Sequence, residues 1–597
     1  MTPLKITIDN RNYSNWSIFN ATTLEPISVN IECNPIQHKL FSGDVFTFNQ
    51  GSNVDIIHSS VRSVDNIPAV LILSNNKTYG RTLGKGITAS GKGKLLYKCV
   101  PDDVRLPTFL VPYEIKHIGF SKVFVNLYVT IKFTEWSDKY PHAILSQTIG
   151  PIDVLDNFYE YQLYCKSLNT SIQKFTKDTS KVIPFRAGKS KDHDDFIESI
   201  STHSHDSIEN RTLWQTFSID PLNSSDFDDA FSIKLLDDNT LLLSIYIANV
   251  TVLMDSLNLW PSFSERISTI YLPDKKRPML PTILSDCLCS LQAHTLRVAF
   301  VLDLVIDRTT NDIVSTKYSN CIIRVDRNFV YEEDALLVYP SYLLLFDTVK
   351  KMNKKYRYIN NIKNSHEAVC YLMILMNYFS AKELLKEKVG IFRSTVVKPL
   401  KHSDLILPDS VPEEVAKFVK IWNSSCGQYI DVSSIEDPDK IDELIKHDLL
   451  DMDAYIHITS PIRRLVDLLN MIKFQEIFGL IKLSHNANHF YLKWINQIDY
   501  INVTMRAIKK VQNDCSLLDT CFNNLGNLDT VYDGYCFDKL VRSDGLYQFV
   551  VYLPELKLTS RITVRENMEN YQLRQYRLFI FNNEEKFKKK IRLQLII

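Results

Sequence analysis

Four aspartates lie within ten positions of one another in the segment FSIDPLNSSDFDDAFSI, residues 217–233. They are Asp220, Asp226, Asp228 and Asp229, and apolar residues flank them on both sides. Two like charges 4 Å apart repel by about 1 kcal/mol in water and by about 4 kcal/mol at an effective dielectric constant of 20. A half-buried cluster of this kind therefore requires protons, basic side chains or metal ions to balance its charge.

The residues inside the cluster allow the carboxylates to converge. Asp220 ends a β-like run. If residues 226–229 are extended, Asp226 and Asp228 lie on one side of the chain and Asp229 faces the other side. Carboxylate ligands without neighbouring His or Cys favour Mg²⁺ or Mn²⁺ over zinc, and a two-metal site is a standard means of hydrolysing a phosphodiester. Four turn-forming residues follow Asp220 and let the chain fold back: Pro221, Asn223, Ser224 and Ser225.

The cluster by itself leaves two questions open. An exposed acidic turn would have the same composition as a metal site. The spacing also does not separate a nuclease from a phosphatase or a nucleotidyl transferase.

Length, charge and cysteine usage bound the class of protein. The chain has 597 residues, enough for several domains, and its 45% hydrophobic and 23% charged composition is that of a globular protein. Lys+Arg and Asp+Glu both number 69, so the net charge gives no indication of a partner. The eleven cysteines include no CxxC pair, which argues against a zinc ribbon and favours a reducing compartment.

The sequence gives no sign of a membrane or secretory segment. The N-terminus lacks the apolar stretch of a signal peptide. The longest apolar runs, such as residues 369–379, are shorter than the ~18–20 residues of a membrane span. We therefore expect a cytoplasmic protein without a membrane partner, and a nuclear location stays open.

Secondary-structure patterns divide the chain into five segments. Residues 1–95 and 96–175 are β-rich runs broken by turn residues, typical of small barrels, and residues 176–212 form a polar linker with room for one short helix. Residues 213–525 form the large central unit, and residues 526–597 return to strands separated by Ser-Asp-Gly turns, which predicts a barrel.

Within the central unit, the patterns predict one strand region and two long helices. Residues 240–254 alternate as a strand, and residues 366–388 and 460–479 have helical periodicity. Ser460 followed by Pro461 predicts the N-cap and first turn of the second helix.

A glycine-rich basic stretch at residues 77–98, KTYGRTLGKGITASGKGKLLYK, is a candidate phosphate-contacting loop. A solvated hairpin is the alternative interpretation of the same residues.

The aspartate segment and three later blocks resemble the ribonuclease II (RNB) family of 3′→5′ exoribonucleases. The resemblance begins at IDPLNSSDFDDA and continues in IYLPDKKRPMLPTILSDCLCSLQAHTLRVAF, IIRVDRNFVYEE and HDLLDMDAYIHITSPIRRLVDLLN, in the family's order. The segments at 101–112 and 135–150 are similar to the eukaryotic exosome-type, RNase R-like branch. We expect no PIN domain, since the barrel-like region starts almost at residue 1.

The resemblance implies an α+β fold and an RNA-degrading activity. It implies N-terminal cold-shock-type OB β-barrels, a central mixed α/β RNB catalytic domain and a C-terminal OB-fold β-barrel. The implied enzyme is a monomeric, Mg²⁺-dependent (or Mn²⁺-dependent) hydrolase that degrades single-stranded RNA from its 3′ end to nucleoside 5′-monophosphates. A place in an RNA-decay complex stays open.

The resemblance also assigns roles to individual residues. It implies that Asp220 and Asp229 are metal ligands and that Asp226 and Asp228 complete the acidic metal site, with Asp228 the most sensitive to substitution. Arg463 would clamp the scissile phosphate, as suits a guanidinium fork. The remaining two residues would contact the nucleotides: Tyr271 at the 3′ terminus and Tyr331 in the channel. Without the resemblance, Tyr271 reads as a core aromatic and Arg463 as a helix-surface charge.

Three departures from the family pattern support a competing hypothesis. Gln512 stands where the family has an acidic residue in a late helix, and Asn249 replaces an aspartate. The arginine expected after the SPIRR motif is also missing, where Met471 and Ile472 stand. The alternative is a catalytically weakened or inactive RNB-fold protein that acts as an RNA-binding factor. A different metal-dependent phosphotransferase is a third hypothesis, but the central region lacks the Gly-rich nucleotide loop that it requires.

Overall fold

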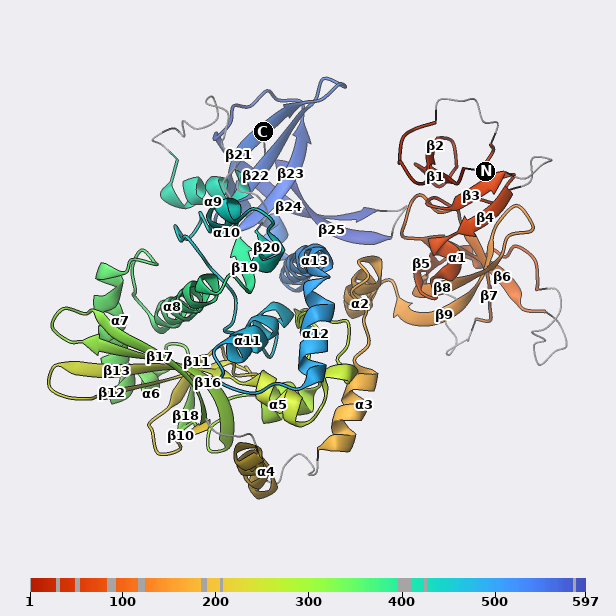
Figure 1. The fold of residues 1–597 in the computed structure, drawn as a ribbon. Helices are drawn as coiled ribbons and strands as arrows, with labels where there is room; N and C mark the ends of the chain where they lie inside the picture. Colours follow the sequence, from red (N-terminus) through yellow and green to blue (C-terminus); the bar gives the residue numbers. More distant parts are fainter. Residues whose placement is uncertain are drawn as a thin grey trace.

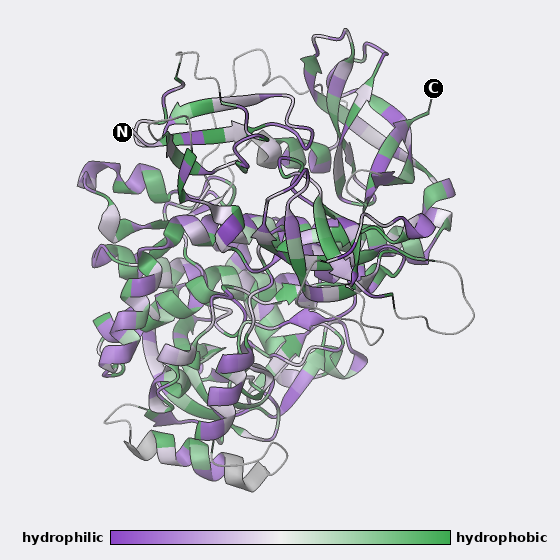
Figure 2. Ribbon diagram, turned by 90° about the vertical axis from the view of Figure 1, so that its right-hand side faces the viewer, coloured by the Kyte–Doolittle hydropathy of each residue, from purple (hydrophilic) through white to green (hydrophobic). Residues whose placement is uncertain are grey.

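The structure is a computed structural model in which three regions follow one another along the chain. An N-terminal β region, a central α/β body and a C-terminal barrel are seen in Figure 1. In both Figure 1 and Figure 2 the N-terminal β region and the C-terminal barrel lie on the same, upper side of the body. The α+β fold with barrels at both ends is therefore confirmed. The structure describes residues 2–27, 33–48, 54–82, 93–115, 124–183, 190–203, 208–395, 408, 411–423, 427–583 and 587–596.

The N-terminal region contains two β units that share one apolar core. The first is a four-stranded sheet in the order β2-β1-β3-β4, and the second is a closed barrel in the order β5-β6-β7-β9-β8. Phe41 stacks on Phe109 of the barrel with ring centroids 5.8 Å apart, which joins the two units. The strands are β1 (Leu4–Ile8), β2 (Trp16–Asn20), β3 (Val45–Phe48), β4 (Val54–His58), β5 (Ile67–Leu71), β6 (Leu95–Pro101), β7 (Phe109–Tyr113), β8 (Leu127–Glu135) and β9 (His142–Pro151).

The barrel runs across residue 95, where the sequence suggested a domain boundary. Strand β6 begins at Leu95 and pairs with β5 on one side and with β7 on the other. The glycine-rich stretch 77–98, the candidate phosphate-contacting loop, lies on the connection between β5 and β6, two neighbouring strands of one barrel. The centre of that candidate phosphate loop, residues 83–92, lies outside the described residues.

The segment expected to be a polar linker packs against the body instead. It contains α3 (Gln173–Val182) and α4 (Ser190–His203), after α2 (Leu155–Cys165). Ile197 and Ile200 of α4 are buried at helical spacing. The linker interpretation was wrong because the polar composition of this segment conceals a narrow apolar stripe.

A seven-stranded mixed sheet forms the centre of the body, in the order β10-β17-β16-β13-β12-β11-β18. Along β13 the odd-numbered residues Leu241 to Ile247 face one core, and Tyr246 and Ala248 face the other. Helices α7 and α8 cover the first face, while α5 and α13 pack in the second core. The elements are β10 (Ile208–Asn210), β11 (Phe217–Asp220), β12 (Asp229–Leu235), β13 (Thr240–Ala248), β16 (Leu296–Asp307), β17 (Ile313–Arg324), β18 (Arg327–Val330), α5 (Val250–Ser256), α7 (Pro340–Lys355), α8 (Ser365–Lys386) and α13 (Ile498–Asn523).

Helix α8 confirms the helix predicted over residues 366–388 and is longer than its apolar run suggested. Its 22 residues and mean hydropathy of 1.2 make it, among the described helices, the one that could cross a membrane by length and composition. Over half, 56%, of the apolar 18-residue stretch of this helix is buried inside the protein. The helix serves here as a core element against α7 and the sheet.

The second predicted helix begins five residues later than expected. Helix α11 spans Leu465–Ile477, and Ser460 does not cap it. The backbone at Arg463–Leu465 is instead paired with the segment at Ile267–Thr269: the Thr269 N–H donates to the Arg463 carbonyl and the Leu465 N–H to the Ile267 carbonyl. This long-range pairing overrides the local capping signal and keeps the SPIRR residues out of the helix.

The C-terminal barrel has the strand order β23-β22-β21-β24-β25, that of a five-stranded OB fold. Gly545 takes a φ of 79° in the predicted hairpin turn, a conformation that glycine adopts without steric cost. Strand β25 reaches the N-terminal region (Figure 1), where Lys588 pairs with Asp102 at 2.7 Å. The strands are β21 (Val531–Val541), β22 (Tyr547–Leu553), β23 (Leu558–Val564), β24 (Leu573–Asn583) and β25 (Lys588–Leu595).

Candidate active site

The residues singled out from the sequence converge on one cavity of about 780 Å³ in the central body. The cavity opens where strand β11 ends and strand β12 begins, and α8 forms one wall. All seven predicted site residues line it: Asp220, Asp226, Asp228, Asp229, Tyr271, Tyr331 and Arg463. The convergence that the turn residues predicted is therefore confirmed.

The aspartate loop folds back as its turn-forming residues require. Asp220 is the last residue of β11, and Asp229 is the first residue of the neighbouring antiparallel strand β12. Between them the Ser224 N–H donates to the Pro221 carbonyl, and Asn223 adopts a positive φ of 70°, which asparagine tolerates better than most residues. The two ends of the loop are thereby brought to one edge of the sheet.

Asp220 and Asp229 are buried, and each keeps one unpaired carboxylate oxygen. Their exposed fractions are 9% and 8%, and the Oδ2 atom of each has no hydrogen-bond partner. Burial, with a smaller contribution from Asp228, raises the pKa of Asp220 to about 7. Burial and then the charge of Asp220 raise the pKa of Asp229 well above its ordinary value. Arg463 opposes both pKa shifts, but among the described residues no basic side chain forms an ion pair with either carboxylate.

Both carboxylate oxygens of Asp228 accept hydrogen bonds from the SPIRR segment. Its Oδ2 accepts from Nε of Arg463 at 2.8 Å, and its Oδ1 accepts from the backbone N–H of Ile462 at 3.1 Å. Burial raises the pKa of Asp228 to about 6, and Arg463 opposes that shift. The Arg463 side chain remains 45% exposed, so it can bind an anion in the cavity while Asp228 holds it.

Asp226 has a different set of partners from the other three aspartates. Its Oδ1 accepts from Nζ of Lys276 at 3.0 Å, and its Oδ2 accepts from the Tyr271 hydroxyl at 3.3 Å. Tyr271 is 41% exposed, and its backbone N–H donates to Oε1 of Gln512 at 3.1 Å. Gln512 therefore reaches the site through Tyr271.

Tyr331 stands beside the Asp220–Asp229 pair. Its backbone N–H donates to the Asp220 carbonyl at 3.1 Å, and its ring lies 5.2 Å from the ring of His366 on α8. Tyr271 and Tyr331 both line the cavity, where aromatic rings can stack on bases.

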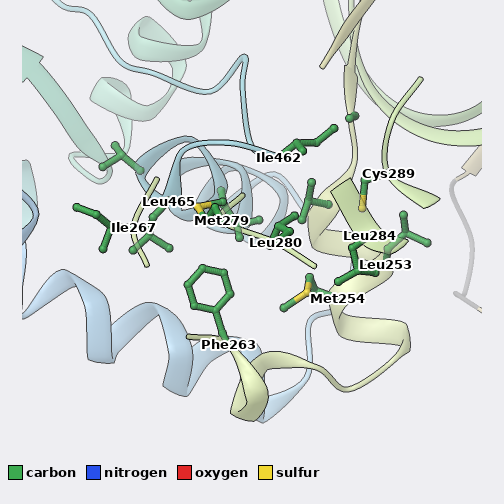
Figure 3. Packing of buried hydrophobic residues seen from close by; sticks show 14 of the residues in the cluster. Leu253, Met254, Phe263, Ile267, Met279, Leu280, Leu284, Cys289, Ile462 and Leu465 are labelled. Atoms are coloured by element: carbon green, nitrogen blue, oxygen red, sulfur yellow. The ribbon is translucent and has the colours of Figure 1, made fainter. Parts of the chain in front are cut away.

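A shared apolar core fixes the segments that carry Tyr271 and Arg463. Met279 and Leu280 follow the Tyr271 hairpin, Ile462 and Leu465 flank Arg463, and all four are fully buried. Figure 3 shows them packed together with Leu253 and its neighbours. One buried cluster therefore supports both Tyr271 and Arg463, although 192 positions separate these residues in sequence.

The other two departures from the family pattern lie away from the cavity. Asn249 caps α5 and joins a fully buried amide network with Asn320 and Gln475. Met471 and Ile472 are buried among apolar residues. These positions carry structural roles, and Gln512 is the departure that contacts a site residue.

Lys276 is the site residue that sequence reasoning missed. It stands within the run DKKR, where nothing in the sequence distinguishes it from Lys275 or Arg277. Its position opposite Tyr271, in the small hairpin of β14 (Ile270–Tyr271) and β15 (Lys276–Arg277), is the signal that could have identified it.

The donor set fits a hard divalent cation held by few protein ligands. No group of three or more His, Cys, Asp or Glu side chains in the described residues is arranged to hold a metal ion. Asp228 is engaged by Arg463 and Asp226 by Lys276, which leaves Asp220 and Asp229 with bare oxygens. Mg²⁺ is commonly held by one or two carboxylates together with water and substrate phosphates, so these two residues suit it.

Barrels at both ends of an α/β body, together with an acidic, arginine-lined cavity, agree with the domain arrangement that the resemblance to the RNB family implies. The model of the RNB domain matches residues 209–341, which include all four aspartates, Tyr271 and Tyr331. This match covers 133 of the 597 residues, so the resemblance to the RNB domain is established for that part of the chain.

Known proteins are similar to the chain over different lengths. Ribonuclease R of Chlamydia muridarum is 22% identical over 393 residues, which cover 57% of this chain and 55% of that protein. The chain spans about half, or less, of the length of the curated relatives that it matches first.

Two solved structures share the fold over almost the whole chain. RNase R of Mycoplasma genitalium, solved with ribose-methylated single-stranded RNA, superimposes with a TM-score of 0.64 at 14% identity and covers 100% of both chains. Yeast Ssd1, a pseudonuclease, superimposes with a TM-score of 0.55 at 13% identity, over 94% of this chain and 78% of Ssd1. At these identities the likeness concerns the fold alone.

Proposed function

We propose that the protein is a divalent-metal-dependent 3′→5′ exoribonuclease that hydrolyses single-stranded RNA to nucleoside 5′-monophosphates. The observation that carries this proposal is the charge arrangement of the cavity. Two buried carboxylates have unpaired oxygens, and an arginine held by a third carboxylate stands beside them. This arrangement can bind a cation and a phosphate side by side.

Each part of the site has a distinct role in this proposal. Asp220 and Asp229 would hold the cation, which would supply an activated water and neutralise charge on the phosphate. Arg463 would bind a non-bridging phosphate oxygen and stabilise the charge that develops during hydrolysis. Asp228 would keep the Arg463 guanidinium aimed into the cavity through its Oδ2, and its Oδ1 already accepts from the Ile462 N–H.

Stacking explains the preference for single strands. Tyr271 and Tyr331 offer two aromatic surfaces inside the cavity, and stacking tolerates any base. A terminal nucleotide that enters must be unpaired to present its base to them. Single-stranded RNA is therefore the proposed partner, and a place in an RNA-decay complex of the cytoplasm or nucleus belongs to the same proposal.

The competing function is an RNA-binding protein without nuclease activity. Gln512 favours it, because a neutral amide replaces the carboxylate expected beside Tyr271. The intact aspartates and Arg463 oppose it, since an RNA-binding protein does not need unpaired buried carboxylates.

A nuclease assay decides between the two. The purified protein is incubated with 5′-labelled single-stranded RNA and Mg²⁺, with Asp228→Asn and an EDTA control in parallel. We expect a ladder that shortens from the 3′ end and release of 5′-monophosphates, both absent from the two controls. RNA that stays intact but shifts on a native gel would overturn the nuclease and support the RNA-binding protein.

A further inference from the structure

Lys276 uses all of its hydrogen-bonding capacity on one side of the cavity. Its ammonium group donates to the Ser225 hydroxyl at 2.5 Å, to Oδ1 of Asp226 at 3.0 Å and to Oδ1 of Asp286 at 3.1 Å. An ammonium group has three N–H donors, so none is left for a substrate. The side chains of Lys276, Asp226 and Asp286 are 25%, 11% and 22% exposed, which limits screening of their charges by solvent.

The Lys276–Asp226 contact also ties the Tyr271 hairpin together. Strands β14 (Ile270–Tyr271) and β15 (Lys276–Arg277) pair so that Tyr271 lies directly opposite Lys276. Asp226 accepts hydrogen bonds from both of these residues, one on each carboxylate oxygen. The carboxylate therefore bridges the hairpin pair and restrains the tyrosine ring.

Asp286 is a second carboxylate that holds Lys276. It belongs to a helical turn at Ile283–Leu288, and its second oxygen accepts from the Ser225 hydroxyl at 3.1 Å. Ser225 in turn precedes Asp226, so the lysine and the aspartate loop share the same anchor. Three separate segments thus meet at the Lys276 ammonium group.

We infer that Lys276, anchored by Asp286, is a positioning residue that keeps Asp226 bound to Tyr271 and outside the cation site. This inference rests on the proposed function and refines it. It assigns the cation to Asp220 and Asp229, whose unpaired oxygens contrast with the occupied oxygens of Asp226. An ammonium group beside Asp226 repels a second cation, which separates the two halves of the aspartate cluster.

Cation binding tests the separation directly, with Mn²⁺ alone as the probe and electron paramagnetic resonance as the readout. Asp220→Asn should weaken Mn²⁺ binding by about 100-fold or more, because even outer-shell partners of a metal ligand cost about 10–100-fold. Asp226→Asn loses only a through-space charge, so its affinity should stay within about fivefold of the unmodified protein. A loss in Asp226→Asn equal to that in Asp220→Asn would overturn the inference.

Positioning of Tyr271 is tested with single-stranded RNA that carries 2-aminopurine at its 3′ end. Stacking quenches the probe, and Tyr271→Ala defines the unstacked signal. Lys276→Met and Asp226→Asn should lose most of the quenching and lower kcat, whereas Lys276→Arg should recover part of both. Lys275→Met is the matched control, because Lys275 is the adjacent, exposed lysine of the same hairpin.

The double variant Lys276→Met/Asp226→Asn distinguishes loss of Tyr271 positioning from simple misfolding. Lys276→Met leaves the Asp226 carboxylate mostly buried and without its cation, and Asp226→Asn removes that unpaired charge. The double variant should therefore be more stable than Lys276→Met and still lack the quenching. Quenching and kcat in Lys276→Met that match those of Lys275→Met would refute the positioning role.

These readouts also separate this inference from the proposed function. A protein that binds Mn²⁺ and RNA without cleaving RNA refutes the nuclease, and the two binding assays still decide the role of Lys276. A protein that binds neither overturns both proposals.

Discussion

The Arg463–Asp228 pair gives the sharpest prediction for catalysis. Arg463→Lys keeps the positive charge but removes the planar fork that reaches two partners at once. In the structure Nε holds Asp228 at 2.8 Å, Nη2 donates to the Ser460 hydroxyl at 3.1 Å, and the group stays 45% exposed toward the cavity. A lysine ammonium that pairs with Asp228 cannot also reach the phosphate in the same geometry.

The expected loss follows from one missing charge-stabilising donor. Removing one such donor typically costs about 10²–10³-fold in kcat, about 2.7–4 kcal/mol of transition-state stabilisation. Folding should change little, because an ammonium still neutralises the buried Asp228. The assay is single-turnover hydrolysis of labelled single-stranded RNA in saturating Mg²⁺, with thermal melting recorded in parallel.

The neighbouring arginine is the matched control. Arg464 donates to the fully buried carboxylate of Asp467 at 2.9 Å, so Arg464→Lys should affect melting more than kcat. A kcat for Arg463→Lys within about threefold of the unmodified protein would refute the phosphate-clamp role, since it corresponds to less than 1 kcal/mol. Equal kcat losses in both variants would show that the effect comes from general disruption of the SPIRR segment.

Three further predictions concern pH, buried polarity and turnover. Burial and nearby Arg393 lower the pKa of His447 from 6.5 to about 4. The neutral imidazole therefore contributes roughly 3 kcal/mol to the free energy of unfolding, a contribution that is complete above pH 6.5 and is lost as the pH falls through 4. His447→Gln should therefore reduce the difference in unfolding free energy between neutral and acidic urea titrations, and an unchanged difference would contradict this. Asn249→Ala removes a helix cap and leaves the amides of Asn320 and Gln475 short of a partner. The variant should lower the free energy of unfolding by about 2–4 kcal/mol in urea titrations. A smaller effect would mean that the network repacks. Gln512→Glu keeps the acceptor for the Tyr271 N–H and adds negative charge that repels a released monophosphate. Steady-state kcat should therefore rise. A fall in kcat would show that the neutral amide favours turnover.

Periodic patterns and motif content predicted much of the architecture. The apolar density of residues 366–388 became α8 almost as expected, because long core helices leave strong periodic signals. The strand predicted over residues 240–254 was correct only as far as Ala248, because Asn249 caps helix α5 at Val250–Ser256 and the chain leaves the sheet there. The same approach failed at residues 190–203, where eleven of the fourteen residues are polar and conceal a narrow buried stripe. It also misplaced the start of α11, because pairing with residues 267–269 determines the backbone there.

The sequence by itself singled out seven residues that line the cavity, through the spacing of the aspartates and the resemblance of the later blocks to the RNB family, but it did not single out Lys276. It also indicated the kind of chemistry, since a cluster of carboxylates demands a counter-charge wherever it is buried. The tertiary structure alone decided how that charge is divided. Asp228 pairs with an arginine 235 positions away and Asp226 with a lysine 50 positions away, which leaves Asp220 and Asp229 open. Hydrogen bonds act over about 3 Å, so partners distant in sequence are chosen only when the packed core brings their segments together.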